Sequence, residues 1–290
     1  MGKIEYFSRN STLLADSSGY RKEAKKNRVN INWWHIRYGE ATQNIGDMLS
    51  EVVFDYLCNY YSLDKDKKVN KTKHLYAIGS ILFFENQDAT IWGTGCLHNM
   101  DCNLYNYIHQ RIMRSLDVRA VRGPCTARTL KSLRIKCPEI YGDPAMLMPL
   151  IYNSYSKKKY DYLVISHYKD YHNEDFQVFP SCSIRYTNMI VSDWKEKIDE
   201  ILSSKCVISS SLHGIVLAES YGIPAILLKP QNEADLFKYN DYYLGTDREK
   251  YVVVDSVEEV IKKELVPTEL PQVDIVQKRL IESFPKDLWE

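Results

Sequence analysis

The sequence has no long hydrophobic run. Its longest strongly apolar candidate, residues 77–84, is far shorter than the roughly 20 residues that a membrane-spanning helix needs. The N-terminus also lacks the apolar core of a signal peptide. These absences argue against a spanning protein and predict a soluble, cytoplasmic one, for which peripheral contact with the inner face of the membrane stays open.

An excess of charge of one sign is also missing. Lys and Arg total 38, Asp and Glu total 38, and the formal net charge is zero. A nucleic-acid partner, which a basic surplus would indicate, is therefore not predicted. Any basic site in this chain has to be local.

The seven cysteines include no Cys-x-x-Cys pair. Zinc sites and disulfide frameworks use paired, regular spacing, so neither is indicated, and we expect reduced, packed thiols. No cluster of carboxylates or histidines has the spacing of metal ligands. We predict no metal site and no bound cofactor, while dependence of the activity on an added metal stays open.

The chain does have a histidine at the point where a buried strand becomes a helix. Residues 205–208 are typical of a strand, and apolar residues recur at helical spacing from Ile215 until Gly222. The unpaired N–H groups and the dipole of a helix N-terminus favour an anion. His213 is predicted to contact that anion, with simple packing in the first helical turn as the alternative. Four neighbours are predicted to bind the same ligand: Ser210, Ser211, Leu212 and Gly214.

A second turn suited to an anion lies upstream, at residues 44–47. A strongly apolar helical run follows, so Asp47 can cap that helix while Gly46 lets the backbone approach a ligand. Asn44 would add a neutral hydrogen bond. Two such turns in two halves of one chain predict one ligand held between them.

Further candidates lie where strands are predicted to end. Residues 89–93 read as a strand that enters a glycine turn at Thr94, a weak indication of a backbone contact with a ligand. Residues 118–121 form a predicted strand ending at Arg122, at the edge where open α/β sheets bind ligands. A surface salt bridge is the alternative for Arg122. His167 follows a predicted strand in the second half.

Strands alternate with helices in both halves of the chain. This alternation predicts an α/β fold of two doubly wound, Rossmann-like domains facing a cleft. The second domain would carry the turn with His213 and end in a terminal helix. The expected divisions, a polar arm, a first domain, a linker and a second domain, are residues 1–29, 30–152, 153–160 and 161–290.

In this order the motifs resemble the polysaccharide pyruvyl transferases, over roughly residues 31–265. The pairing of Asn-x-Gly-Asp with Ser-Leu-His-Gly is the most specific part of the resemblance. The family often has arginine immediately before Leu-His-Gly, where this chain has Ser211. The matching segments are Asn44-Ile-Gly-Asp47, Ile91-Trp-Gly-Thr-Gly95, Val121-Arg122-Gly123, Gly142-Asp143-Pro144, His167-Tyr168, Ser209-Ser-Ser-Leu-His213-Gly214 and Gly222-Ile-Pro224.

The resemblance implies a fold like that of GT-B glycosyltransferases. It also implies transfer of a pyruvyl group from phosphoenolpyruvate to a sugar hydroxyl pair, forming a pyruvate ketal in the biosynthesis of a capsule or other surface polysaccharide such as an exopolysaccharide. The implied partners are phosphoenolpyruvate and a saccharide acceptor, which can be lipid-linked. For this chemistry His213 is our first choice as acid and clamp, Asp47 as base, and His167 as a second acid–base candidate. Arg122 would pair with the donor's carboxylate or phosphate.

Two other functions stay open. Glu219 also looks like the ribose-binding glutamate of nucleotide-sugar glycosyltransferases, with Lys229 close to the phosphates. In that case the donor would be a nucleotide sugar. The third hypothesis is a non-catalytic saccharide-binding protein, because the 22 tyrosines and 5 tryptophans could stack on sugar rings.

Overall fold

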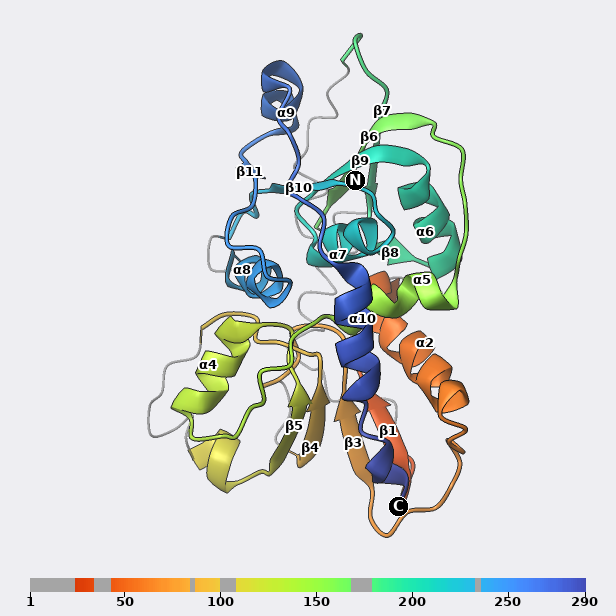
Figure 1. Cartoon of the computed structure of the whole chain (residues 1–290), viewed down its shortest axis with the longest axis vertical. Helices are drawn as coiled ribbons and strands as arrows, with labels where there is room; N and C mark the ends of the chain where they lie inside the picture. The colour runs from red at the N-terminus through yellow and green to blue at the C-terminus, as the bar shows by residue number, and fades with distance from the viewer. Residues whose placement is uncertain (1–23, 34–42, 84–86, 100–107, 168–178, 233–235) are drawn as a thin grey trace, which may run out of the picture.

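Two parallel β-sheets, one in each half of the chain, form the framework of the protein (Figure 1). The computed structural model describes residues 24–33, 43–83, 87–99, 108–167, 179–232 and 236–290. Helices alternate with strands in both halves, so the mixed α/β fold with parallel sheets is confirmed. The finer assignment of two doubly wound, Rossmann-like domains stays a prediction.

The first sheet has four parallel strands in the order β1-β3-β4-β5. Val29 lies opposite Lys73, and Leu75 lies opposite Thr90. All four residues of β4 are buried, which is typical of a parallel strand covered on both faces. The strands are β1 (Val29–Asn32), β3 (Lys73–Tyr76), β4 (Ala89–Trp92) and β5 (Leu116–Ala120).

The second sheet has five parallel strands in the order β11-β10-β9-β6-β7. Val164 lies opposite Ile208 across the central pair, and Ile226 lies opposite Ile208 on the other side. The strands are β6 (Tyr160–Ser166), β7 (Ile184–Asn188), β9 (Ser204–Ser209), β10 (Ala225–Leu228) and β11 (Val253–Val254).

A small antiparallel pair connects the two halves. It comprises β2 (Gln43–Asn44) and β8 (Ile190–Val191), with Asn44 opposite Ile190. The backbone N–H of Ile45 donates to the carbonyl of Met189 at 2.9 Å, which continues the link by one residue. The turn at residues 44–47 is therefore held against the second half of the chain.

Two helices of the second half, α6 and α9, begin at side-chain caps. Asp193 accepts from the backbone N–H of Lys195 at 2.8 Å, and Ser256 accepts from Glu259 at 3.2 Å. The α-helices of the described ranges are α2 (Ile45–Tyr60), α4 (Pro124–Ser132), α5 (Met148–Ile151), α6 (Trp194–Leu202), α7 (Leu212–Ser220), α8 (Leu236–Gly245), α9 (Val257–Lys263) and α10 (Val273–Glu282). The same ranges contain the 3₁₀ helices η3 (Pro144–Leu147) and η5 (Lys286–Trp289) and the π-helix η2 (Ile108–Ile112).

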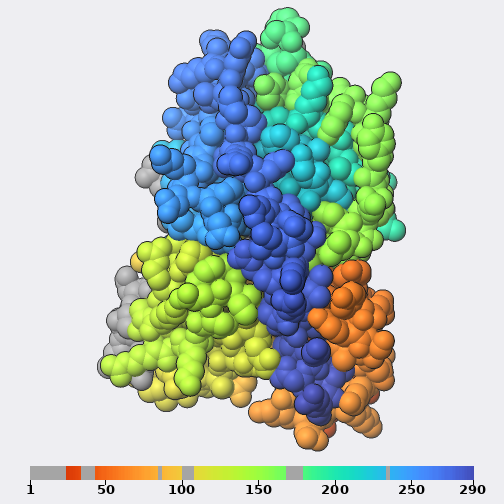
Figure 2. Space-filling model, viewed as in Figure 1, coloured from red at the N-terminus to blue at the C-terminus, as the bar shows by residue number. Residues whose placement is uncertain are grey.

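The C-terminal segment returns to the first half of the chain. Figure 2 shows this blue segment running from the upper half across the lower half. The indole N–H of Trp92 donates to the carbonyl of Leu280 at 3.0 Å, and that of Trp289 donates to Asp64 at 3.0 Å. Phe284 packs edge-on against Trp92. Residues 273–290, which we predicted to belong with the second domain, are thus bound to the first by apolar and aromatic contacts.

The predicted N-terminal arm, residues 1–29, lies mostly outside the described residues. Residues 1–23 lie outside the described residues, and β1 already begins at Val29, whose side chain is buried. Residues 152–159 contain neither helix nor strand and connect α5 with β6, where the linker was expected. The six described cysteines are free thiols, while Cys102 lies outside the described residues.

Candidate functional site

The turn before α7 is built by serine hydroxyls. Ser209 Oγ lies 2.8 Å from the carbonyl oxygen of Ile165 and accepts from the backbone N–H of Ser211 at 2.9 Å. Ser211 is the N-cap residue of α7, and its side chain makes no capping hydrogen bond. The first N–H groups of a helix have no acceptor within the helix, so the N-terminal turn of α7 offers donors to an anion.

His213 lies in this first turn and touches the other predicted turn. A Cβ placed on Gly46 would lie 1.9 Å from His213 Nδ1 and 2.5 Å from two neighbouring ring atoms. Such distances show that the imidazole rests directly on the Gly46 backbone, where only glycine fits. The two turns that were predicted to hold one ligand are thus in contact with each other, and the ligand itself stays a prediction.

Asn44, and not Asp47, caps α2. Its side-chain oxygen accepts from the backbone N–H of Gly46 at 3.0 Å, and α2 begins at Ile45. The prediction of Asp47 as the cap was wrong because the cap residue precedes the first helical residue, whereas Asp47 is already the third residue of the helix. The Asp47 carboxyl group therefore does not cap the helix and is available for another role.

The Asp47 carboxyl is a weaker acid than an ordinary aspartate. Desolvation by the surrounding protein raises its pKa to about 7, and the opposing influence of His213 is smaller. Gly79, with a φ of 104°, lies close on another side, since a Cβ there would be 3.2 Å from Asp47 Oδ1. A carboxyl that titrates near neutrality beside a histidine suits general acid–base chemistry.

The raised pKa makes the stability contribution of Asp47 dependent on pH. The carboxyl keeps its proton up to about pH 7 in the folded protein, against an ordinary value of 3.8. Folding thus takes up a proton between these pH values, so the free energy of unfolding falls as pH rises through that window. Asp47→Asn, which stays neutral, is expected to raise the free energy of unfolding by about 1–3 kcal/mol at pH 8 and to change it little at pH 4.

Denaturant unfolding of both proteins at pH 4, 6 and 8 measures this difference. Asp55→Asn is the matched control, because Asp55 lies on the same helix with a half-exposed side chain paired to Lys65. A gain from Asp47→Asn that is the same at pH 4 and pH 8 would contradict the assignment of the shifted pKa.

Asp143 also faces His213, from a third element. Its Oδ2 lies 3.6 Å from His213 Nε2. The side chain of Asp143 is 1% exposed and that of His213 is 13% exposed. Within the described ranges Nε2 is buried and has no hydrogen-bond partner. Sequence reasoning placed Asp143 in a motif but assigned it no role.

Arg122 is engaged within the protein. Its Nε donates to Asp241 Oδ2 at 3.1 Å, Nη1 to Ser80 Oγ at 2.8 Å and Nη2 to the carbonyl of Cys96 at 2.6 Å. The pair with Asp241 is buried and joins the first half of the chain to α8 in the second. The predicted alternative for Arg122, a surface salt bridge, was wrong because its ion pair is buried. Direct contact of Arg122 with a donor stays a prediction.

The glycine turn after β4 contacts protein groups in this structure. The Thr94 hydroxyl donates to the carbonyl of Gly79 at 2.6 Å and is buried. A Cβ on Gly93 would lie 2.3 Å from Pro144, and one on Gly95 would lie 2.5 Å from the Arg122 guanidinium carbon. The close approaches that these glycines permit are to other parts of the chain, and not to a surface where Thr94 could reach a ligand.

Three predicted residues lie at one edge of the second sheet. His167, Ser210 and Lys229 directly follow β6, β9 and β10, which are neighbours in the sheet. The backbone N–H of His167 donates to Ser210 Oγ at 2.8 Å. The carboxyl ends of parallel strands are where α/β proteins bind ligands, so their common position agrees with the prediction.

Glu219 has a structural role in this protein. It is fully buried, and both carboxylate oxygens accept from Arg248, at 2.8 and 2.7 Å. The Tyr242 hydroxyl donates to one of them at 2.7 Å. Its predicted role as a ribose ligand is not what the structure shows, because the carboxylate is enclosed by partners from the same half of the chain.

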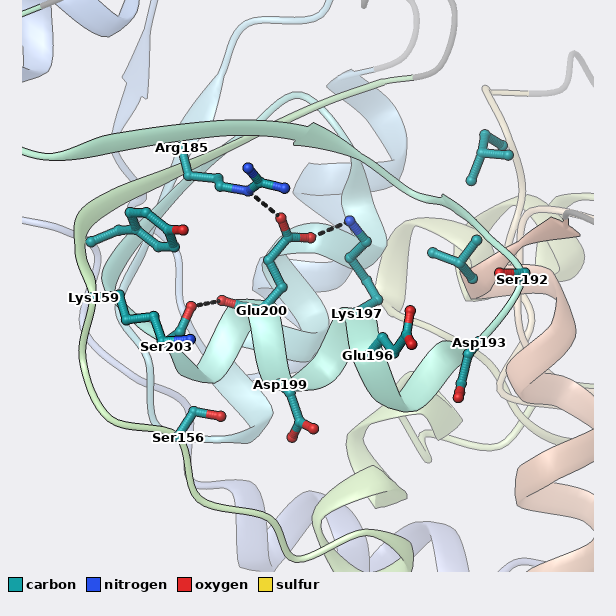
Figure 3. A pocket seen from close by; sticks show the side chains of 13 residues that line it. Ser156, Lys159, Arg185, Ser192, Asp193, Glu196, Lys197, Asp199, Glu200 and Ser203 are labelled. Atoms are coloured by element: carbon teal, nitrogen blue, oxygen red, sulfur yellow. Dashed lines mark hydrogen bonds and ion pairs between the residues drawn. The ribbon is translucent and has the colours of Figure 1, made fainter.

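A cavity of about 690 Å³ lies beside α6 and β7 and contains none of the predicted site residues. Within it Glu200 lies between Arg185, 2.8 Å away, and Lys197 (Figure 3). The wall also includes Ile190, which pairs with Asn44 through the β2–β8 link. The cavity therefore adjoins the turn at residues 44–47 without including it.

Two features are absent from the described residues. Across those ranges, no helix combines the length and the apolar character needed to cross a bilayer. The same part of the chain holds no group of three or more His, Cys, Asp or Glu side chains arranged around a metal ion. The candidate site thus consists of helix N-termini, one imidazole and two carboxyl groups.

Fold and site together define an α/β protein with an anion-suited site where its two halves meet. Residues 41–232, well over half of the chain, match the polysaccharide pyruvyl transferase family. The chain belongs to this family and is a transferase of polysaccharide biosynthesis with a saccharide acceptor.

Two further similarities are more distant. The chain is 27% identical over 241 residues to an uncharacterized protein of Acanthamoeba polyphaga mimivirus, an alignment that covers 75% of this chain and 76% of that protein. A structure of the wall teichoic acid polymerase TagF matches with a TM-score of 0.37 and 10% identity, over 99% of this chain and 91% of that chain. At that score the likeness carries no argument, and the GT-B-like arrangement stays a prediction.

Proposed function

We propose that the protein transfers a pyruvyl group from phosphoenolpyruvate to two hydroxyls of a saccharide, forming a pyruvate ketal. The observation that carries this proposal is the contact between His213 and Gly46. It brings two helix N-terminal turns, an imidazole and the Asp47 carboxyl to one point. The helix N-termini suit the phosphate and carboxylate of the donor, and the two titratable groups suit the proton transfers.

In the proposed reaction His213 gives a proton to the methylene carbon of phosphoenolpyruvate. A sugar hydroxyl oxygen then bonds to the central carbon and passes its proton to Asp47. The bond from the central carbon to the phosphate oxygen breaks, and phosphate leaves with the proton from Asp47. The second hydroxyl bonds to the same carbon, closing the ketal, and its proton restores the imidazolium of His213.

The remaining assignments complete the proposal. Asn44, Ser210 and Ser211 would donate neutral hydrogen bonds to the donor, and His167 is a second acid–base candidate at the same sheet edge. The acceptor would be a sugar of a surface polysaccharide repeat, with a lipid-linked form included. The reaction would take place in the cytoplasm, where the protein could meet a lipid-linked acceptor at the inner face of the membrane.

The rival donor is a nucleotide sugar. Its main support in the sequence was Glu219 as a ribose ligand, and that carboxylate is enclosed by Arg248 and Tyr242. The family membership does not favour it either. Phosphoenolpyruvate is therefore the better-supported donor.

Calorimetric titration with phosphoenolpyruvate, beside a panel of nucleotide sugars, tests this choice. We expect saturable binding of phosphoenolpyruvate that weakens about 10- to 100-fold in His213→Ala, because a charge-assisted hydrogen bond is lost. His109→Ala, a half-buried histidine on the π-helix η2, is the matched control and should bind normally. Saturation by a nucleotide sugar alone would move the assignment to a glycosyltransferase.

A further inference from the structure

The imidazole of His213 is fixed by protein groups on two sides. Gly46 packs against the ring beside Nδ1, and Asp143 Oδ2 faces Nε2 at 3.6 Å. Nε2 itself is buried and lacks a hydrogen-bond partner among the described residues. A buried ring nitrogen without a partner is costly, and a catalytic role is one of the explanations for such a group in a native protein.

Asp143 is held so that only one of its oxygens faces the ring. Its Oδ1 accepts from the backbone N–H of Ala145 at 3.0 Å as the N-cap of η3. The helix η3 packs against α2, α7 and α10, so the cap is anchored where the two halves meet. With Oδ1 occupied, Oδ2 is presented to His213 as a fixed, buried acceptor.

Two carboxyl groups therefore interact with the imidazole from different elements. Asp143, the N-cap residue of η3, lies 3.6 Å from Nε2, and Asp47, in the first turn of α2, interacts with the ring electrostatically. Because Nε2 is buried, the exposed 13% of the His213 side chain belongs to its other atoms. Nδ1, beside Gly46, is then the ring nitrogen that remains for a substrate.

We propose that Asp143 is a positioning residue for His213. Its Oδ2 accepts a hydrogen bond from the Nε2–H group, which holds the neutral ring in one tautomer. Nδ1 is then the nitrogen that exchanges protons with the substrate. The separation of 3.6 Å is longer than a hydrogen bond, and catalytic contacts of this kind often shorten when substrate is bound. A carboxylate that orients an imidazole in this way also stabilises the imidazolium that forms during catalysis.

The assignment of the His213 tautomer is argued from the geometry alone. The assignment of proton exchange to Nδ1 also depends on the proposed function. Asp143→Asn separates the two. An amide oxygen can still accept from the Ala145 N–H and keep the η3 cap, while the amide NH₂ replaces Oδ2 and donates to Nε2. The variant should therefore fold, and its neutral His213 should carry the proton on Nδ1.

Nitrogen-15 NMR of the imidazole rings, with His213→Ala to assign the signals, reads the tautomer directly. We expect protonated Nε2 in the wild type and protonated Nδ1 in Asp143→Asn. Asp193→Asn is the matched control, since Asp193 caps α6 by the same kind of bond. Pyruvyl transfer by Asp143→Asn should show a kcat lowered about 10²- to 10⁴-fold with a nearly unchanged KM for phosphoenolpyruvate.

The possible results are distinguishable. An unchanged tautomer in Asp143→Asn would overturn the positioning role. A changed tautomer in a protein that does not use phosphoenolpyruvate would keep Asp143 as the positioning residue and overturn the proposed donor. A changed tautomer with an unaltered kcat would overturn the assignment of Nδ1 as the proton-exchanging nitrogen.

Discussion

Replacing His213 with alanine is expected to lower kcat for pyruvyl transfer by about 10²- to 10⁴-fold, the usual contribution of a general acid or base. The imidazole supplies the proton for the methylene carbon in the proposed reaction. Steady-state assay of phosphate release with phosphoenolpyruvate and an acceptor saccharide measures the loss.

Gly46→Ala should reproduce much of this loss without removing the imidazole. The new methyl carbon would lie 1.9 Å from Nδ1, so the ring or the turn has to move. A misplacement of about 1 Å can cost 10²-fold in rate. His109→Ala should retain full activity, which checks for a general effect of histidine removal. Near-normal kcat in Gly46→Ala would mean that the packing of His213 against Gly46 is not needed for catalysis.

Local patterns in the sequence predicted the surroundings of His213 well. The strand expected at residues 205–208 is β9, and the helix expected after it is α7. Each of these depends on hydrophobic spacing and on turn residues within about ten positions, which a sequence displays directly. The sequence also indicated that the two turns belong to one site, because both have the chemistry to bind an anion.

Contacts between distant residues were beyond such reasoning. Asp241 lies 119 positions after Arg122, in α8, a helix for which the sequence analysis had no expectation. Arg248 encloses Glu219 in the same way. Charged residues pair with whatever the fold brings near, so their partners cannot be read from spacing. The return of α10 to the first half has the same origin, since Trp92 and Leu280 meet only in the folded chain.

Arg122→Met is expected to lower the free energy of unfolding by about 3–5 kcal/mol, because it leaves the buried Asp241 carboxylate without its counter-charge. Asp241 would keep the N–H and hydroxyl of Thr126, at 2.9 and 2.6 Å, but neither carries a charge. Denaturant unfolding at neutral pH measures the loss. Methionine preserves much of the apolar volume of the arginine stem, so the change mainly reports the ion pair.

Arg119→Met is the matched control. Arg119 pairs with Asp117 and Asp287 where all three side chains are about a third to a half exposed, and such a pair contributes roughly 0–1 kcal/mol. Equal losses of unfolding free energy in the two variants would show that burial does not increase the contribution of Arg122 to stability. The double variant Arg122→Met/Asp241→Asn should recover part of the stability, because it removes the orphaned charge.

These unfolding experiments also decide how the predicted donor role of Arg122 should be tested. A variant that is less stable binds less ligand simply because less of it is folded. Titration of Arg122→Met with phosphoenolpyruvate therefore has to be done at a temperature where unfolding curves show the variant to be folded. Weaker binding by that folded variant would support contact with the donor, whereas unchanged binding would leave Arg122 with the structural role that its three protein partners already give it.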